Sequence, residues 1–484
     1  MERWSVWVCV LWAACVPAPG TPAWPDGPDS FETSSGAHLP DAPTRTRDGE
    51  EPDEIPPVDP EPADNGGRAL VFDGPPPKNL LVISIDTLRR DQLGRYAGDN
   101  LTPFLDRVAE EGVALDDFMQ CSNWTFASTT CTMQGRSNID AGFMPMFAIH
   151  GGEPVPDDTE FLPTWLAPAG FRSILKSTNY NFSPVNNNAQ GFDDASETPV
   201  EDGWFAWGRA VQALSDMKTG TAPPDRWYVH VHVMEPHRPY DPPAEFRGEV
   251  DALPPIPVDL TDADVHMDVV ENWDDLTPGE QDLALAHLWA LYRGDVRTLD
   301  DLIRQIWEDA AARGMLDDTL VVLWSDHGEQ FFEHGDQRHA YSLNREENDA
   351  IAIFWAPNLR PQAWTGPTTA PDIVPTVLDA FDLPIPDSVT GIPAGGASPD
   401  RARFAFTVGR GGVIQGVRYG RWHLIYGWAG RLSLYDVVAD PTEAVDLYDP
   451  QHPMLPTLWG LLEPKVLEAD PLVPLFTPEL PVVE

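Results

Sequence analysis

Basic residues are scarce in this chain. Its 484 residues include 31 lysines and arginines against 77 aspartates and glutamates, so the formal net charge is -46 at pH 7. A surface this acidic repels phosphate backbones, which excludes ordinary nucleic-acid binding. Any site that binds an anion must therefore be a local exception, and it needs a metal ion or focused hydrogen-bond donors.

The apolar run near the N-terminus is short. Residues 4–16 are apolar except for Ser5, whereas a membrane-spanning helix needs about 20 such residues. Arg3 before this run, and small residues and prolines after it, predict a signal peptide over residues 1–20. The end of the run is also similar to a bacterial lipoprotein signal with Cys15 as the lipidated residue, although Trp12 stands where that pattern prefers leucine. We therefore expect a secreted, periplasmic or cell-envelope protein, with plain cleavage favoured over a membrane tether through Cys15.

Cysteine is also rare, with four residues in the chain. Cys9 and Cys15 fall in the predicted signal peptide, so the mature protein would keep Cys121 and Cys131. In an oxidising compartment these two can form a disulfide. The sequence favours neither the disulfide nor two free buried thiols.

Composition predicts the domain organisation. Residues 21–77 are rich in proline, glycine and acidic residues, with too little apolar surface to offset the entropy of ordering, which predicts a disordered linker. Residues 78–400 contain regular apolar runs and helical segments, as expected of one large folded domain. Residues 401–470 change to short aromatic and β-branched runs around glycines, which indicates a small C-terminal α+β subdomain with antiparallel hairpins.

The large domain alternates apolar runs with helical segments. Leu80–Ile85, Leu320–Trp324 and Ile351–Trp355 are nearly continuous apolar runs, as expected of strands buried on both faces of a sheet. Between them, residues 277–280 have the pattern of a helix capping box, and a long helical stretch follows. This alternation predicts an α/β fold with a doubly wound sheet and helices on both faces.

Two of these strands end on acidic residues. Asp86 follows the first, and Asp326 and His327 follow the second. Ligands of open α/β sheets bind beyond the carboxyl ends of the strands, so these three side chains can converge. Two carboxylates and an imidazole suit a divalent cation, with Zn²⁺ or Mn²⁺ favoured, whereas Ca²⁺ prefers oxygen ligands alone.

From Asn79 to about Leu467, the sequence resembles the sulfatase family of the alkaline-phosphatase superfamily. The matching segments occur in the family's order: Ile83–Asp91, Thr102–Asp106, His232–Tyr240, Ser325–Glu329, Glu333–Gly335, His339, Arg421–Ile425, Leu434–Asp436 and Asp440–Pro441. The resemblance implies an alkaline-phosphatase-like α/β/α sandwich with one divalent metal ion. It departs from the family at Thr87, where sulfatases usually carry a second aspartate.

The nucleophile position also departs from the family. Sulfatases carry Cys-x-Pro-x-Arg, or serine in place of cysteine, and oxidise that residue to formylglycine. Counting back from Gln134–Arg136, which is similar to the family's Thr-Gly-Arg, the position falls on Thr125, with Ala127 and Thr129 in place of the proline and arginine. Threonine cannot become formylglycine, so the chain is most similar to the family's threonine-nucleophile relatives, which are phosphodiesterases, phosphatases and phosphoglycerol or phosphoethanolamine transferases. We expect Thr125 to bind the metal and attack the substrate, at a helix that begins near Ala127.

Histidines should complete the site. By the same resemblance, His237 and His339 would protonate the leaving group, stabilise the transferred group or hold a second metal ion. His232 is expected to bind substrate or support a ligand, and Lys176 or Asn179 could reach the site from the preceding strand. Glu329 is expected to support these groups rather than bind the metal.

Three functions are compatible with these residues. The first is a metal-dependent hydrolase or transferase of phosphate mono- or diesters with Thr125 as nucleophile. The second is a sulfatase that works without formylglycine, and the third is an inactive, surface-tethered binding protein that keeps the fold. The substrate of an active enzyme would be an anionic ester, either a small molecule or a group linked to a glycan or lipid.

Overall fold

The computed structural model describes residues 68–145, 153–199, 202–220, 223–427 and 430–472. The predicted signal peptide and residues 21–67 of the predicted linker lie outside the described residues. The linker was expected to reach residue 77, but Ala69 and Leu70 are already buried, and Phe72 pairs with Leu359. The short apolar run 69–72 supplies enough apolar surface to pack against the domain.

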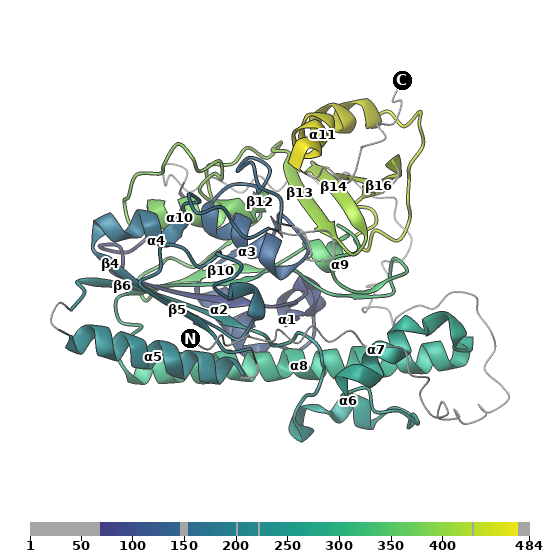
Figure 1. Cartoon of the computed structure of the whole chain (residues 1–484), viewed down its shortest axis with the longest axis horizontal. Helices are drawn as coiled ribbons and strands as arrows, with labels where there is room; N and C mark the ends of the chain where they lie inside the picture. The colour runs from purple at the N-terminus through teal and green to yellow at the C-terminus, as the bar shows by residue number, and fades with distance from the viewer. Residues whose placement is uncertain (1–67, 146–152, 200–201, 221–222, 428–429, 473–484) are drawn as a thin grey trace, which may run out of the picture.

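A mixed sheet forms the centre of the described chain (Figure 1). Its strands lie in this order: β11 (Gln362–Trp364), β2 (Val113–Leu115), β10 (Ala352–Trp355), β7 (Thr319–Ser325), β1 (Asn79–Ile85), β6 (Arg226–Val233), β4 (Phe171–Ser177) and β5 (Asp194–Glu197). β10 runs antiparallel to both of its neighbours, and the other pairs are parallel.

The sequence predicted β10 as a buried strand but not its direction. The segment between β7 and β10 contains only one short helix, α9 (Arg345–Asn348). The connection, residues 326–351, is long enough for a crossover but has no helix long enough to pack on a face of the sheet, and the chain turns back beside β7 instead.

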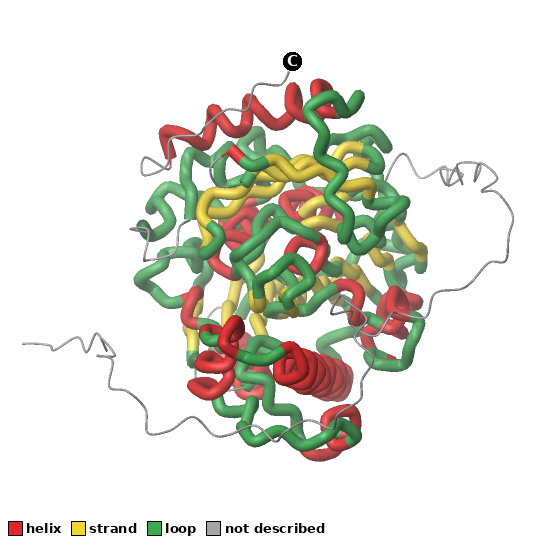
Figure 2. The backbone as a smooth tube through the Cα atoms, turned by 90° about the vertical axis from the view of Figure 1, so that its right-hand side faces the viewer, coloured by secondary structure: helices red, strands yellow, loops and turns green. Residues whose placement is uncertain are grey.

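Helices cover both faces of the sheet, as predicted for a doubly wound α/β/α sandwich. One face packs against α2 (Pro103–Glu111), α5 (Gly203–Thr219) and α8 (Pro278–Ala312), and α8 is seen end-on below the sheet in Figure 2. The other face packs against α3 (Thr125–Gln134), α4 (Leu162–Leu166) and α10 (Ile373–Ala380). Smaller elements complete this domain: α1 (Gly94–Ala97), α6 (Gly248–Asp251), α7 (Ala263–Glu271), the β3 (Phe118–Met119) and β12 (Thr368–Thr369) pair, and the β8 (Gln330–Phe331) and β9 (Gln337–Arg338) pair.

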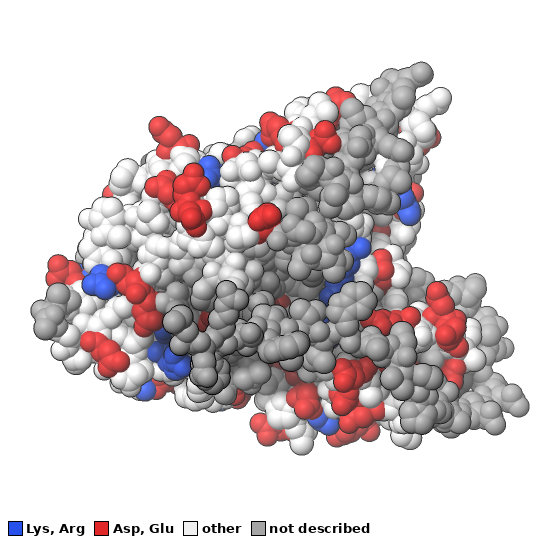
Figure 3. Space-filling view, viewed as in Figure 1, with Lys and Arg blue, Asp and Glu red and all other residues white. Residues whose placement is uncertain are grey.

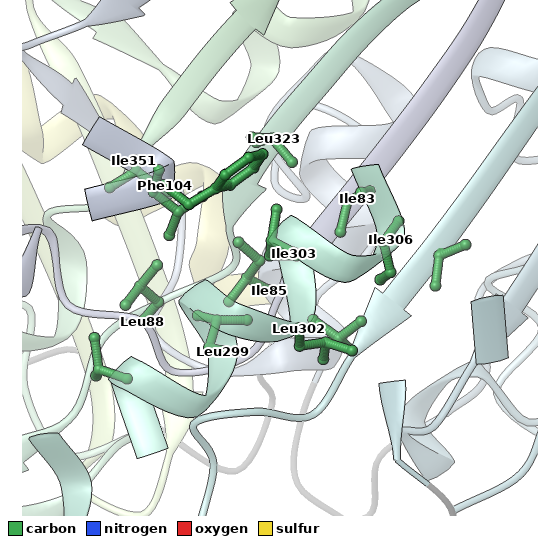
Figure 4. Packing of buried hydrophobic residues seen from close by; sticks show 14 of the residues in the cluster. Ile83, Ile85, Leu88, Phe104, Leu299, Leu302, Ile303, Ile306, Leu323 and Ile351 are labelled. Atoms are coloured by element: carbon green, nitrogen blue, oxygen red, sulfur yellow. The ribbon is translucent and has the colours of Figure 1, made fainter. Parts of the chain in front are cut away.

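The alternation of β1 divides its side chains between the two layers. Ile83 and Ile85 pack against Leu299 and Ile303 of α8 (Figure 4). Leu80 and Val82 belong to the cluster on the other face. Each such buried aliphatic side chain contributes roughly 1.5–3 kcal/mol, and this packing fixes the direction in which β1 delivers its last residues.

The long helix α8 begins as the sequence predicted. Thr277 Oγ1 accepts the backbone N–H of Glu280, and a Glu280 carboxylate oxygen accepts that of Thr277.

Acidic side chains gather around α6, α7 and α8 at the lower edge of the molecule (Figure 3). Within the described ranges, no helix combines the length and apolar character required to cross a bilayer.

A separate antiparallel sheet follows at the C-terminal end. It consists of β13 (Arg403–Gly409), β14 (Gly412–Tyr419), β15 (Trp422–Tyr426) and β16 (Leu432–Asp436), and α11 (Leu455–Ala469) packs on it.

The structure joins Cys121 and Cys131 in a disulfide, with Cα atoms 6.7 Å apart. Of the two states left open by the sequence, the structure therefore contains the disulfide.

Candidate active site

The predicted metal ligands meet where β1 and β7 end. These strands are neighbours in parallel register, with Ile85 opposite Ser325, so Asp86 and Asp326 follow them side by side. The next residue, His327, completes the group. One ligand atom from each of Asp86, Asp326 and His327 lies within 4.8 Å of the others, and all three side chains are fully buried.

The chemistry of this group fits a divalent cation. Asp86 Oδ1 and Asp326 Oδ2 are buried and have no hydrogen-bond partner. Burial and the neighbouring Asp86 charge raise the pKa of Asp326 well above its ordinary value. Two adjacent buried carboxylates are stable in their charged forms only with a cation between them.

His327 presents the nitrogen that such a cation would require. Its Nδ1 lies 2.8 Å from the carbonyl of Gly328, so Nδ1–H donates there and the Nε2 lone pair points to the carboxylates. Burial, followed by repulsion from His339, lowers the pKa of His327 to about 3, which keeps the imidazole neutral, as a metal ligand must be. The residue after it must be glycine, because a Cβ at Gly328 would lie 1.9 Å from the carbonyl oxygen of Glu346.

Thr125 lies beside the same group. Its Oγ1 is 3.4 Å from both Asp86 Oδ2 and His327 Nε2. Thr125 is the first residue of α3, two residues earlier than the predicted start near Ala127, and no side chain caps this helix. The first N–H groups of α3 are therefore available for an anion bound at Thr125.

Thr129 supplies no charge to the site. It stands where the family pattern has arginine, but its hydroxyl donates to the carbonyl of Thr125 at 2.6 Å and to that of Phe126 at 3.4 Å. This hydroxyl is satisfied by its own helix. The positive charge that opposes an anionic substrate must come from a metal ion and from groups on other elements.

Asn179 and His232 both contact Asp86. Asn179 Nδ2 donates to Asp86 Oδ2 at 2.5 Å and lies 3.5 Å from Thr125 Oγ1. His232 Nε2 is 3.4 Å from Asp86 Oδ2, and its Nδ1 is 2.8 Å from the hydroxyl of Ser84. Burial alone would raise the pKa of Asp86, but His237, His232 and His327 outweigh it and hold that pKa below its ordinary value.

His237 and His339 lie on the adjacent side. The rings of His327 and His339 are 4.4 Å apart between centroids, and those of His237 and His339 are 5.4 Å apart. His339 Nδ1 lies 2.8 Å from Glu329 Oε1, which leaves Nε2 for a substrate. Burial alone would raise the pKa of Glu329, but His339 and His237 lower it to about 2, so Glu329 is a carboxylate.

Lys176 is not brought into this group. Its Nζ contacts Asp194 Oδ1 at 2.6 Å and Ser196 Oγ at 3.1 Å, both on the neighbouring strand β5. The other candidates named from the sequence converge through their contacts with Asp86, Thr125 and His327.

Two supporting residues were not predicted from the sequence, Ser84 and Arg338. Ser84 contacts His230 Nε2 and His232 Nδ1, each at 2.8 Å, and so links the two histidines of β6. Arg338 is buried near Glu329, contacts the hydroxyl of Tyr341 at 3.2 Å and has a free Nε–H. A polar residue inside the apolar strand β1 was a usable indication for Ser84, whereas nothing in the local sequence indicated the position of Arg338.

Comparison with known proteins identifies the family. The sequence model described as Sulfatase matches residues 78–383, which is more than half of the chain. The chain belongs to the sulfatase family. Solved structures with a similar fold also confirm the predicted alkaline-phosphatase-like sandwich with a C-terminal antiparallel sheet.

Curated relatives of this sulfatase-family chain match over different lengths. The choline-sulfatase of Rhizobium meliloti is 26% identical over 176 residues, which covers 34% of this chain and 34% of that protein. The human N-acetylgalactosamine-6-sulfatase is 27% identical over 183 residues, which covers 31% of this chain and also 34% of the relative. The chain thus spans about a third of these two relatives. The Delta 4,5-hexuronate-2-O-sulfatase of Bacteroides thetaiotaomicron is 21% identical over 433 residues, with coverage of 77% of this chain and 85% of that protein.

Solved structures share the fold. The phosphonate monoester hydrolase from Silicibacter pomeroyi superposes with a TM-score of 0.61 at 19% identity, covering 81% of this chain and 95% of that one. A protein solved with its substrate D-glucosamine-2-N,6-O-disulfate gives a TM-score of 0.59 at 17% identity, covering 83% and 98%.

Proposed function

We propose that this sulfatase-family chain is a metal-dependent hydrolase or transferase of phosphate mono- or diesters, with Thr125 as the nucleophile. The observation that carries the proposal is the position of the Thr125 hydroxyl, 3.4 Å from a carboxylate and from an imidazole of the candidate metal group. By its resemblance to the family sequence, Thr125 stands at the position that sulfatases oxidise to formylglycine. A sulfated threonine lacks the hemiacetal route by which formylglycine releases sulfate, and therefore phosphate chemistry is favoured.

Asp86, Asp326, His327 and Thr125 would hold the metal ion, with Zn²⁺ or Mn²⁺ favoured. When bound, it would lower the pKa of the Thr125 hydroxyl and neutralise charge on the transferred group. Thr125 Oγ then attacks phosphorus as an alkoxide, forming an O–P bond while the bond to the leaving oxygen breaks. The N–H groups at the start of α3 face the charge that develops on the phosphoryl oxygens.

His339 is placed to move the proton. Glu329 holds its Nδ1 side, so Nε2 can donate a proton to the leaving oxygen. In the second step, water or an acceptor alcohol attacks phosphorus and returns its proton to Nε2, and Thr125 leaves as the alkoxide. His237, whose Nδ1 is held by the carbonyl of Arg238 at 2.7 Å, presents its other nitrogen beside His339 and can contact a phosphoryl oxygen.

The substrate is proposed to be an anionic ester, either free or linked to a glycan or lipid. The named relatives act on sulfated or phosphonate compounds, which supports an anionic ester in general. The positive charge of Arg338, which interacts with the charge of Glu329, would attract such a group. The predicted signal peptide supports a location outside the cytoplasm, with plain cleavage favoured over lipidation of Cys15.

A second candidate function is hydrolysis of sulfate esters, because the curated relatives are sulfatases by name. The experiment that separates the two uses purified mature protein with its bound metal quantified. Turnover of an aryl phosphate, a phosphodiester and an aryl sulfate is measured side by side. We expect a phosphate ester to be the best substrate, whereas faster turnover of the sulfate ester would overturn the phosphate proposal.

A further inference from the structure

A second charged cavity lies between the large domain and the C-terminal sheet. It has a volume of about 320 Å³, at the lower end of the range for small-molecule sites. We name it the arginine pocket after its four lining arginines: Arg90, Arg345, Arg403 and Arg418. Four carboxylates also line it: Asp116, Asp117, Asp349 and Glu443. None of these residues belongs to the candidate active site.

Two arginines of this pocket face each other directly. Arg403 of β13 and Arg418 of β14 are opposite partners in the antiparallel register, and each is at least 95% buried. Like charges directly opposite on two strands destabilise a sheet. Burial lowers the pKa of Arg403, Asp117 opposes this effect, and Arg418 reinforces it. Two buried guanidinium groups therefore lie side by side, each paired on one side with a carboxylate: Arg403 Nη1 donates to Asp117 Oδ1 at 2.7 Å, and Arg418 Nη1 donates to Asp349.

The carboxylates of the pocket are already occupied by other groups. Asp349 is contacted by Arg418, by Arg90 at 2.6 Å and by Arg345 at 3.3 Å. Glu443 Oε1 is contacted by His423 Nδ1 at 2.7 Å. These acids have little capacity left to accept further hydrogen bonds.

The arginines retain free donors. Arg403 Nε, Arg418 Nε and Arg418 Nη2 are buried without a hydrogen-bond partner, and Nη2 comes no closer than 3.6 Å to Glu443. Among the described lining residues, the buried side-chain atoms that lack a hydrogen-bond partner are all guanidinium nitrogens. Buried donors left unpaired are costly, typically by about 1–3 kcal/mol each, and an oxyanion would satisfy several of them at once.

We propose that the arginine pocket binds the oxyanionic group, carboxylate or phosphate, of a small polar molecule. The guanidinium groups of Arg403 and Arg418 line the cavity and would turn their unpaired N–H groups toward its oxygens. The rim is accessible, because the lining residue Val438 is 64% exposed. This second site is independent of ester turnover at Thr125.

Substitution of Val438 tests anion binding in the pocket and leaves the buried ion pairs intact. In the full chain, Val438→Glu places a negative charge at the rim, and Val438→Gln is its neutral control of the same size. Binding of inorganic phosphate and of malonate is measured by titration calorimetry. We expect at least one of the two anions to bind, with an affinity about threefold to tenfold lower in Val438→Glu than in Val438→Gln.

Phosphate bound at the active site is followed separately as inhibition of ester turnover, which should be equal in both variants. Malonate binding can be measured even if no ester is turned over, so the pocket can be tested when the proposed enzymatic function fails. Selective binding of phosphate or of malonate would identify the source of the oxyanion. Absence of binding by both anions, or equal affinities in the two Val438 variants, would overturn the proposal.

Discussion

The active site and the arginine pocket are both buried and highly charged, yet they leave opposite kinds of atoms without partners. At the active site the unpaired atoms include the carboxylate oxygens Asp86 Oδ1 and Asp326 Oδ2. In the arginine pocket they are guanidinium N–H groups of Arg403 and Arg418. The unpaired atoms indicate what each site lacks, which is a cation in the first and an anion in the second.

The largest effect is expected from Thr125→Ala. Loss of the nucleophile should lower kcat for phosphate esters by about 10³-fold or more, since the remaining groups can only assist direct attack by water. Thr129→Ala is the matched control, because its hydroxyl bonds only the backbone of α3, and its kcat should stay within about threefold. Turnover of Thr125→Ala close to that of the control would remove Thr125 from the mechanism.

Asp326→Asn tests whether the two buried carboxylates of the active site hold a cation. The variant should lose its stoichiometric metal, as measured by elemental analysis, and kcat should fall by about 10²-fold or more. Without metal, the unfolding temperature of this variant should exceed that of the wild-type protein, because one of two repelling buried carboxylates is gone. A metal-free wild-type protein as stable as the metal-free variant would mean that the two carboxylates do not repel each other.

Glu329→Gln tests the role of His339. The substitution keeps the size of the side chain but removes the charge beside Nδ1, so kcat should fall about 10- to 100-fold with KM little changed. The loss should be greatest for esters with poor leaving groups, which need the proton most. An equal loss for good and poor leaving groups would show that His339 does not protonate the leaving oxygen.

Asp295 is a buried carboxylate of a third type, which lies outside both the candidate metal group and the arginine pocket. Burial raises the pKa of Asp295 to about 8, only partly opposed by the N–H of Asp241 that it accepts at 3.0 Å. Because the unfolded chain releases this proton at lower pH, the stability contributed by protonated Asp295 is lost between about pH 4 and pH 8.

Asp295→Asn mimics the protonated form and should remove this pH dependence. The variant should match the wild-type free energy of unfolding at pH 4 and exceed it by about 1–2 kcal/mol at pH 8, as measured by urea denaturation. An equal difference at both values of pH would show that Asp295 is charged in the folded protein. This variant is also a suitable buried-carboxylate control for Asp326→Asn.

The sequence predicted the convergence of Asp86, Asp326 and His327 because these residues follow apolar strands, whereas Thr125 was assigned by resemblance to the family's nucleophile position. The carboxyl edge of a parallel sheet then brings them together whatever their separation in the chain. Lys176 could not be placed in the same way, because its partner Ser196 lies on an edge strand with little apolar character.

Other features depend on register between distant segments. The antiparallel direction of β10 goes with a connection that has no long crossover helix, which apolar runs do not encode. The opposition of Arg403 and Arg418 requires the hairpin register of β13 and β14, and their partners Asp117 and Asp349 come from the large domain. A charged pocket at such a boundary has no local sequence pattern.

The central claim, that Thr125 carries the phosphoryl group in a covalent intermediate, is tested most directly by the stereochemical course at phosphorus. An aryl phosphate made chiral with three oxygen isotopes is reacted in the presence of an alcohol acceptor, and the configuration of the product ester is determined. Two successive in-line displacements, first by Thr125 and then by the acceptor, predict retention of configuration. Inversion would contradict the account, because it would require a single direct displacement.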